Sequence, residues 1–296
     1  MTQEGSPQDD DSYLGYSTTT GEFNGDGDRL DVAVGMPRGA NLTGKVVLYN
    51  ANLTNLDNVT GHQIGAYFGY CLASCDVNGD GLDDLLIGSP MWTDYSVMDR
   101  FETGRVYVVY QDKQHRFRNF DTLTGETHKA RFGISVASLG DINLDGFQDL
   151  AVGAPYGGRE GRGAVYIFLG SREGVVKKPS QVIMAADLNT PSLRTFGWSI
   201  SGGLDMDSNQ YADMLVGAYS SGHAVFMKAA PIVHMVAKVS FDRQSKQVML
   251  HCTHGIGGLA SLMIAMRMTR IMSTMRMIMA ISMKHSRLTW KTSSAP

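Results

Sequence analysis

The chain has 296 residues, of which 43% are hydrophobic, and this length is sufficient for a sizeable core built on one main repeat array. Its 34 glycines are typical of turn-dense β proteins, and its formal net charge of −3 includes an acidic first 242 residues that disfavour nucleic-acid binding. No uninterrupted apolar run of 18 residues occurs, so the sequence predicts no transmembrane span.

The chain opens with a polar segment, residues 1–11, which we expect to be disordered. A repeat begins at residue 12, and its acidic loop precedes a strand-like apolar segment. The carboxylate and amide side chains of this loop are candidate calcium ligands, although one extra residue separates the last of them from the others. These candidates are Glu22, Asn24, Asp26 and Asp31, with Asp28 as an alternative.

The first repeat also contains three Asn-X-Thr sequons between residues 41 and 60. They place candidate glycosylation sites at Asn41, Asn52 and Asn58, all in turn-like sequence. Chance is the alternative explanation for any single sequon. Together the three indicate an extracellular origin.

Three further acidic loops follow at residues 76–84, 141–149 and 205–213. Each has an oxygen-bearing side chain at positions 1, 3, 5 and 9, and an apolar or aromatic residue at position 7, where only the backbone carbonyl could bind. Calcium prefers six to eight oxygen ligands of these kinds, so the spacing predicts one ion in each loop. The candidate ligands are Asp76, Asn78, Asp80, Leu82, Asp84, Asp141, Asn143, Asp145, Phe147, Asp149, Asp205, Asp207, Asn209, Tyr211 and Asp213.

Two other interpretations of these loops can be weighed. An EF-hand needs a glutamate at position 12 and a following helix, whereas Ile87, Val152 and Val216 stand there, in short apolar runs that suit buried strands. Ordinary Asp/Asn/Gly turns are the second alternative, and three loops in register argue against it. The loop must turn tightly at position 6, where glycine reaches a positive φ at little cost. Position 6 is glycine in the first two loops but Gln210 in the last, so the calcium prediction is weakest for the last loop.

The sequence around each loop recurs with a period of 64 or 65 residues. A Phe-Gly pair precedes the loop, and a glycine-rich turn and a strand-like run follow it. Units with about four strand signals are typical of β-propeller blades, whereas a β-sandwich has no reason to repeat one loop at this interval. We therefore predict an all-β fold with four propeller repeats over residues 12–235, at about 12–66, 67–130, 131–194 and 195–235.

These motifs resemble a known family. Phe132-Gly133, the loop at 141–149 and Gly153-Ala154-Pro155 match the FG-GAP repeat, and roughly residues 12–252 resemble the second half of an integrin alpha subunit head. The resemblance implies the last four blades of a seven-bladed propeller, so that the propeller would be incomplete in this chain. It also implies that the three regular loops are structural calcium sites on the face away from ligand.

The resemblance further implies a function. Integrin alpha subunits are glycoproteins of the plasma membrane that pair with an integrin beta subunit and bind extracellular matrix proteins, and their full-length members are membrane-anchored. The chain is therefore expected to belong to a cell-adhesion and signalling receptor. The alternative is the propeller of a secreted enzyme such as glycosylphosphatidylinositol-specific phospholipase D, which would need an added His/Asp-rich zinc domain.

The end of the chain differs in kind. Residues 236–255 alternate like a strand and resemble the start of an immunoglobulin-like leg domain. Residues 256–296 are rich in methionine, and no acidic residue follows Asp242 although eight basic ones do. Such a segment could form a membrane-surface helix, but we interpret its repetitive pattern as sequence read out of frame.

No catalytic motif stands out, and the sequence predicts a protein that is not an enzyme. Ser135 and Ser199 follow glycines in near matches to a nucleophile elbow, but both runs are repeat positions that enter a strand. Cys71 and Cys75 are four residues apart on a strand, which is awkward for a mutual disulfide, so both are expected to be small buried side chains.

Overall fold

A computed structural model describes residues 10–27 and 30–230 with their side chains, and four later strands by their backbone alone. Chain contacts divide the protein into two compact units, Met1–Ala229 with Trp290–Pro296, and Ala230–Thr289. Among the described residues, no helix is both long and apolar enough to cross a membrane. The predicted polar segment 1–11 lies almost wholly outside the described residues.

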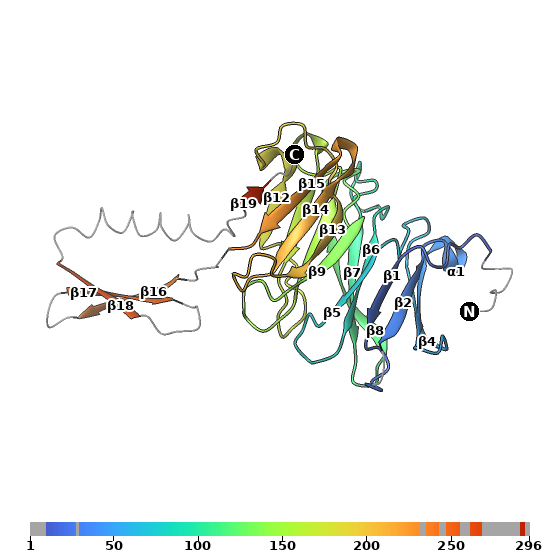
Figure 1. The fold of residues 1–296 in the computed structure, drawn as a ribbon, viewed down its shortest axis with the longest axis horizontal. Helices are drawn as coiled ribbons and strands as arrows, with labels where there is room; N and C mark the ends of the chain where they lie inside the picture. The colour runs from blue at the N-terminus through green and yellow to red at the C-terminus, as the bar shows by residue number, and fades with distance from the viewer. Residues whose placement is uncertain are drawn as a thin grey trace. The chain divides into compact units, whose positions relative to one another are not determined.

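The first unit consists of four antiparallel sheets that follow one another in chain order, called blades 1 to 4 here (Figure 1). Each sheet has its strands in sequence order, as expected of a propeller blade. The all-β propeller prediction is thereby confirmed. Blade 1 contains β1 (Thr18–Gly21), β2 (Asp31–Met36), β3 (Lys45–Tyr49) and β4 (Asn55–Thr60); blade 2 contains β5 (Leu72–Cys75), β6 (Asp84–Ser89), β7 (Arg105–Gln111) and β8 (Phe117–Thr124). Blade 3 contains β9 (Ser135–Gly140), β10 (Asp149–Ala154), β11 (Ala164–Phe168) and β12 (Gln181–Met184); blade 4 contains β13 (Phe196–Leu204), β14 (Asp213–Ala218), β15 (His223–Lys228) and β19 (Lys291–Ser293).

Helical structure in the described residues is confined to short turns between strands. They are α1 (Gly39–Leu42) and the 3-10 turns η2 (Arg159–Gly161), η3 (Ala185–Asp187) and η4 (Tyr219–Ser221). Of the three sequons, Asn41 lies in α1 and Asn52 in a turn, whereas Asn58 lies within β4. The expectation that all three occupy turns was therefore wrong for Asn58, because β4 is a polar edge strand without the apolar run that marks an inner one.

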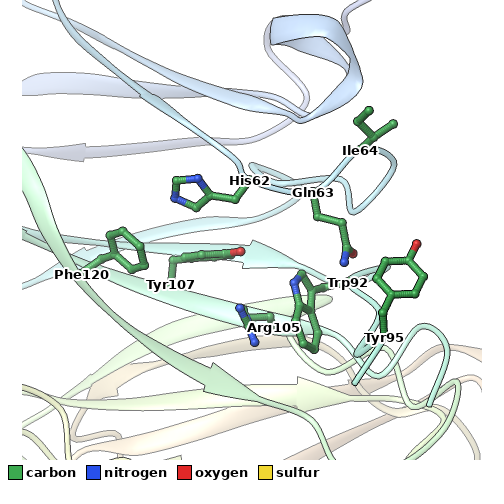
Figure 2. A pocket seen from close by; sticks show the side chains of 8 residues that line it. All are labelled: His62, Gln63, Ile64, Trp92, Tyr95, Arg105, Tyr107 and Phe120. Carbon is green, nitrogen blue, oxygen red and sulfur yellow. The ribbon is translucent and has the colours of Figure 1, made fainter. Parts of the chain in front are cut away.

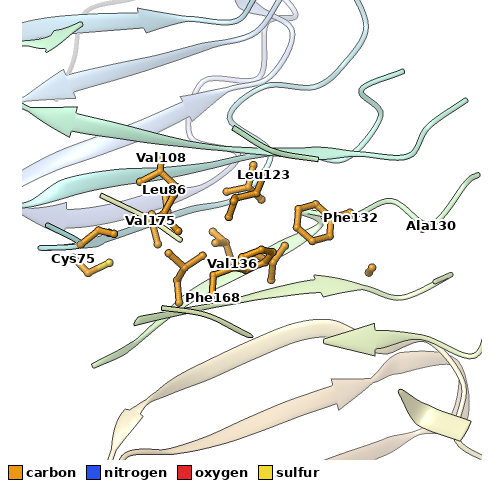
Figure 3. Packing of buried hydrophobic residues seen from close by; sticks show 14 residues of the cluster. Cys75, Leu86, Val108, Leu123, Ala130, Phe132, Val136, Phe168 and Val175 are labelled. Carbon is orange, nitrogen blue, oxygen red and sulfur yellow. The ribbon is translucent and has the colours of Figure 1, made fainter. Parts of the chain in front are cut away.

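The second strands of blades 2 and 3 are buried along their whole length, because sheets cover both of their faces. This explains why their sequences read as continuous apolar runs and not as an alternating pattern. The packing between these two blades forms one hydrophobic cluster around Leu86, Val108, Phe132 and Val152 (Figure 3). The phenylalanine of each Phe-Gly pair, at 68, 132 and 196, is at most 2% exposed.

The Phe-Gly pairs also join consecutive blades. Single parallel bridges connect Gly44 with Phe68, Gly104 with Phe132 and Gly163 with Phe196. Side chains have no room at these joints: a Cβ added at Gly88 would collide with the carbonyl oxygen of Gly133, and one at Gly153 with that of Gly197. The repeated glycines are therefore required by the close approach of one blade to the next.

The second unit contains an antiparallel sheet of β16 (Met235–Asp242), β17 (Gln247–His254) and β18 (Ser261–Arg267). The predicted leg-domain start at 236–255 overlaps β16 and β17, and its residues 243–246 and 255 lie outside the described residues. Most of the basic tail, including 268–290, lies outside the described residues. Its residues 291–293 pair with β15, so the fourth strand of blade 4 comes from the tail and not from the repeat itself.

Candidate metal centres

The four acidic loops occupy equivalent places in the four blades. Each connects the first strand of its sheet to the second, so all of them lie at the same end of their blades. Within every loop the backbone folds around the first acidic side chain. The repeat period found in the sequence thus corresponds to one loop per blade.

The acidic residue at position 1 accepts hydrogen bonds from backbone N–H groups later in the loop. Asp76 accepts from the N–H groups of residues 79, 80 and 81 at 2.7, 3.1 and 2.8 Å. Asp141 accepts from 145 and 146 at 3.0 and 2.8 Å, and Asp205 from 209 and 210 at 3.0 and 2.7 Å. Glu22 accepts from 24 and 25 at 3.3 and 2.7 Å. The loops therefore close into compact turns with their side-chain oxygens gathered inside.

The side chains at positions 3 and 5 continue the same pattern. In blades 2 and 3, the amide groups of Asn78 and Asn143 donate to the carboxylates of Asp80 and Asp145 at 3.1 and 2.8 Å. Those carboxylates in turn accept from the backbone N–H groups at position 7, at 3.0 and 3.1 Å. Position 7 is Leu82 or Phe147 in these two blades and has no side-chain oxygen, so a ligand role for its backbone carbonyl stays a prediction.

The aspartate at position 9 has a second task that the sequence did not reveal. Asp84 and Asp149 are fully buried, and each accepts two backbone hydrogen bonds. For Asp149 these come from Ile142 at 3.0 Å and from Gly170, after β11, at 2.9 Å. Asp84 accepts the equivalent pair of bonds from the backbone N–H groups of residues 77 and 111. Asp213 accepts them from residues 206 and 229. The position-9 carboxylate therefore connects the loop by hydrogen bonds to the end of the third strand.

Burial of these carboxylates disfavours their charged form. Desolvation raises the pKa of Asp84 and of Asp149 to about 7, and the neighbouring carboxylates contribute in the same direction. A cation within the loop would offset both effects. The donor set, which consists of carboxylate and amide oxygens, fits a hard divalent ion such as calcium.

The loop of blade 4 brings its carboxylates closest together. Ligand oxygens of Asp205, Asp207 and Asp213 all lie within 4.8 Å of one another. Gln210, which replaces the glycine of the other loops, has a φ of +74°, so the loop keeps its wrapped shape despite the side chain. Lys228 lies 3.3 Å from Asp207 and supplies a positive charge at the edge of the cluster.

The loop of blade 1 departs from the others, as its sequence predicts. Asp31 still accepts from the N–H of Phe23 at 3.0 Å and from the side chain of Asn24 at 3.2 Å, so the extra residue is accommodated. Asn24 also donates to Asp26 at 2.9 Å. The alternative ligand Asp28 lies outside the described residues. The structure thus brings together all four expected oxygen-bearing residues.

Sequence reasoning missed the residues that tie one loop to the next blade. Asp83 accepts the backbone N–H of Glu22 at 2.8 Å, and the side chain of Gln111 donates to the carbonyl oxygens of residues 22 and 83 at 2.8 and 3.1 Å. The role of Asp83 could have been suspected from the sequence, because a second acidic residue stands there directly before the candidate ligand Asp84. Nothing in the sequence pointed to Gln111.

A second missed set lies two residues after the glycine of Phe68-Gly69, of Phe132-Gly133 and of Leu14-Gly15, the equivalent pair in the first repeat. Ser17, Cys71 and Ser135 donate to the carbonyl oxygens of Gly69, Gly133 and Gly197, at 2.8, 3.2 and 2.8 Å. Each bond runs from one blade to the next. The structural interpretation of Ser135 is therefore confirmed, because the hydroxyl of this near match to a nucleophile elbow holds two blades together.

The sheets and their acidic loops define a propeller of the FG-GAP class, and the FG-GAP repeat family matches residues 68–109 and 132–168. The chain is 51% identical over 255 residues to integrin alpha-PS2 of Drosophila melanogaster, covering 84% of this chain and 18% of the relative. It is 43% identical over 244 residues to integrin alpha-5 of Xenopus laevis (82% and 23%) and 42% over 246 residues to integrin alpha-V of Gallus gallus (81% and 23%). The chain is thus an integrin alpha propeller fragment.

The chain spans about a fifth of the length of these relatives. The similarity supports the expected integrin alpha propeller and gives no support to the alternative of a secreted phospholipase. Cys71 and Cys75 are free, as predicted; Cys75 is buried, whereas Cys71 is half-buried. Desolvation raises the pKa of both thiols to about 12.

Proposed function

We propose that these blades belong to a cell-surface adhesion receptor subunit and that their four acidic loops bind calcium to keep the blades in register. The observation that carries the proposal is the repeated hydrogen-bond pattern within the loops, found in a chain 51% identical to an integrin alpha subunit. In this proposal the loops have a structural role and take part in no catalysed reaction. The position-1 and position-9 carboxylates orient the loop, and the bound ion neutralises them.

The proposal extends to partners. An integrin beta subunit would pair with the receptor that contains these blades, and an extracellular matrix protein would be its ligand. Support comes from the similarity to three integrin alpha subunits over more than 80% of this chain. The sequons Asn41, Asn52 and Asn58 agree with an exposed extracellular surface, since all three asparagines are exposed.

Pairing can be tested with the full receptor that contains these residues. It is co-expressed with a beta subunit, recovered from the cell surface with an antibody to that subunit, and compared with a double variant, Asp80→Ala with Asp145→Ala. The proposal predicts reduced surface recovery of the double variant, because two adjacent blades lose a ligand each. Equal recovery of both proteins would show that these loops are not needed for the assembled receptor.

A further inference from the structure

A groove runs along blades 1 and 2, and none of the candidate calcium ligands lines it. It consists of two pockets of about 550 and 180 Å³ that share His62, Tyr107 and Phe120 as lining residues. We call this feature the blade 1–2 groove. Its total size is in the range of ligand-binding clefts, although it is wide open to solvent on one side.

Aromatic rings form the floor of the blade 1–2 groove. Figure 2 shows Phe120, Tyr107, Arg105 and Trp92 one after another along one side, with His62 and Gln63 opposite them. The ring centroids of Tyr107 and Phe120 are 5.7 Å apart, and those of His62 and Phe120 are 5.5 Å apart. Packing therefore fixes these rings in place before anything binds.

The groove is also stiffened by polar contacts. The guanidinium of Arg105 lies 3.5 Å from the ring centroid of Trp92, and its Nε donates to Thr124 at 3.0 Å. Gln63 donates to the carbonyl oxygen of Thr93 at 2.9 Å and accepts from the N–H of the same residue at 2.8 Å. Such a floor presents flat apolar faces with hydrogen-bonding groups at their edges.

Part of this aromatic surface is left open. Phe120 is 45% exposed and Tyr95 is 78% exposed, although both rings line or border a concave site. Exposed aromatic side chains gathered in a hollow mark a surface that is covered by a ligand or a partner. Rings flanked by polar groups suit a sugar, whose C–H face stacks on aromatic rings while its hydroxyl groups take hydrogen bonds at the edges.

The sequon asparagine Asn58 lies at the smaller end of the groove. Asn58 and Thr60 both line the pocket of about 180 Å³, together with Phe120. Asn58 is exposed on the edge strand β4 and so is accessible to modification. The other two sequon asparagines line neither pocket of the groove.

We propose that the blade 1–2 groove holds the first sugars of an N-linked glycan attached to Asn58. Attachment forms a bond between Nδ2 of Asn58 and the anomeric carbon of a lipid-pyrophosphate-linked oligosaccharide. The anomeric C–O bond breaks, the amide loses a proton, and the lipid pyrophosphate leaves. The attached N-acetylglucosamine units then stack on Phe120 and His62. Tethering at the rim gives these sugars a high effective concentration in the groove, so weak stacking contacts are sufficient.

The inference rests on the extracellular route of the proposed function and not on the calcium loops. The test is site-resolved glycan mass spectrometry of the full chain, directed into the secretory pathway of an animal cell line. A glycan held against the protein is shielded from trimming enzymes. The oligomannose fraction at Asn58 is therefore expected to be several-fold higher than at Asn52, which lies in an exposed turn outside the groove.

Two variants separate stacking from general effects of mutation. Phe120→Ser removes the open ring of the groove and is expected to bring the oligomannose fraction at Asn58 down to that at Asn52. Phe101→Ser is the matched control, because Phe101 is 50% exposed and lies outside both pockets. It is expected to leave the glycan at Asn58 unchanged.

Several results would overturn the inference. Equal trimming at Asn58 and Asn52 in the protein without mutations would show that the sugars at Asn58 are free in solvent. This comparison does not depend on the folding of any variant. An unchanged glycan in Phe120→Ser would show that the ring does not hold it. A glycan at Asn52 but none at Asn58 would count against the groove alone, whereas glycan at no sequon would count against the extracellular route as well.

Discussion

The hydroxyl of Ser135 in blade 3 donates a hydrogen bond to the carbonyl oxygen of Gly197 in blade 4, at 2.8 Å. Ser17 and Cys71 make the equivalent bonds from blades 1 and 2. Each bond lies where a glycine allows the two backbones to touch. In the first three repeats, a small polar side chain two residues after the glycine that opens the repeat therefore joins one blade to the next.

The first prediction concerns this joint. Ser135→Ala leaves a buried carbonyl without its side-chain donor and is expected to lower the free energy of unfolding by about 1 kcal/mol. Ser199→Ala is the matched control: Ser199 has the same repeat position but is exposed, and no hydrogen bond of its hydroxyl is found among the described residues. Urea denaturation measures both. Equal losses in the two variants would show that the bond between blades is not what matters at this position.

The second prediction separates the two kinds of loop carboxylate. In a chelator, Asp149→Ala is expected to lower the free energy of unfolding by about 3 kcal/mol, because two buried backbone N–H groups lose their acceptor. Asp145→Ala removes an exposed side chain and is expected to have a much smaller effect under the same conditions. Its cost should appear only when calcium is added. Thermal melts of both variants in chelator and in calcium measure the difference, and identical behaviour would contradict the two roles.

The third prediction concerns Gln210. A side chain at a φ of +74° is strained by about 1 kcal/mol, and glycine reaches this conformation freely. Gln210→Gly is therefore expected to raise the melting temperature, and to do so with or without calcium. Gly146→Gln, the reverse change at the same position of blade 3, should lower it, since Gly146 has a φ of +94°. A fall in the first variant would mean that the glutamine side chain makes a stabilising contact.

The fourth prediction concerns the thiols. Burial raises the pKa of Cys71 and Cys75 to about 12, so at pH 8 both remain in the protonated, unreactive form in the folded protein. Iodoacetamide at pH 8 is expected to leave both unmodified until a denaturant is added. Peptide mass spectrometry reads each cysteine separately. Rapid alkylation of Cys71 without denaturant would show that the joint between blades 2 and 3 opens readily.

Much of the fold could be predicted because several independent features of the sequence repeat with the same period. The spacing of the loops, the buried phenylalanines at 68, 132 and 196 and the apolar second strands all repeat with one period, and each corresponds to one blade. The liganding pattern at positions 1, 3, 5 and 9 was visible for the same reason. These features depend on residues close together in the chain.

The features that escaped prediction depend on distant contacts. The acceptor role of Asp149 toward Gly170 involves a residue 21 positions away, and the bond from Gln111 to residue 22 spans 89 positions. The blade 1–2 groove is likewise assembled from β4, β7, β8 and two separate connections. The last strand of blade 4 comes from residues 291–293, whose sequence carries no repeat motif.

Calorimetric titration with calcium is the most direct test of the central claim, that one ion per loop stabilises the blades. We expect the chelator-treated protein to bind about four ions, one for each blade. The variant Asp145→Ala is expected to bind one ion fewer and to show a smaller rise in melting temperature on addition of calcium. If calcium produced neither binding heat nor any change in melting temperature, the acidic loops would be ordinary turns and the central claim would be contradicted.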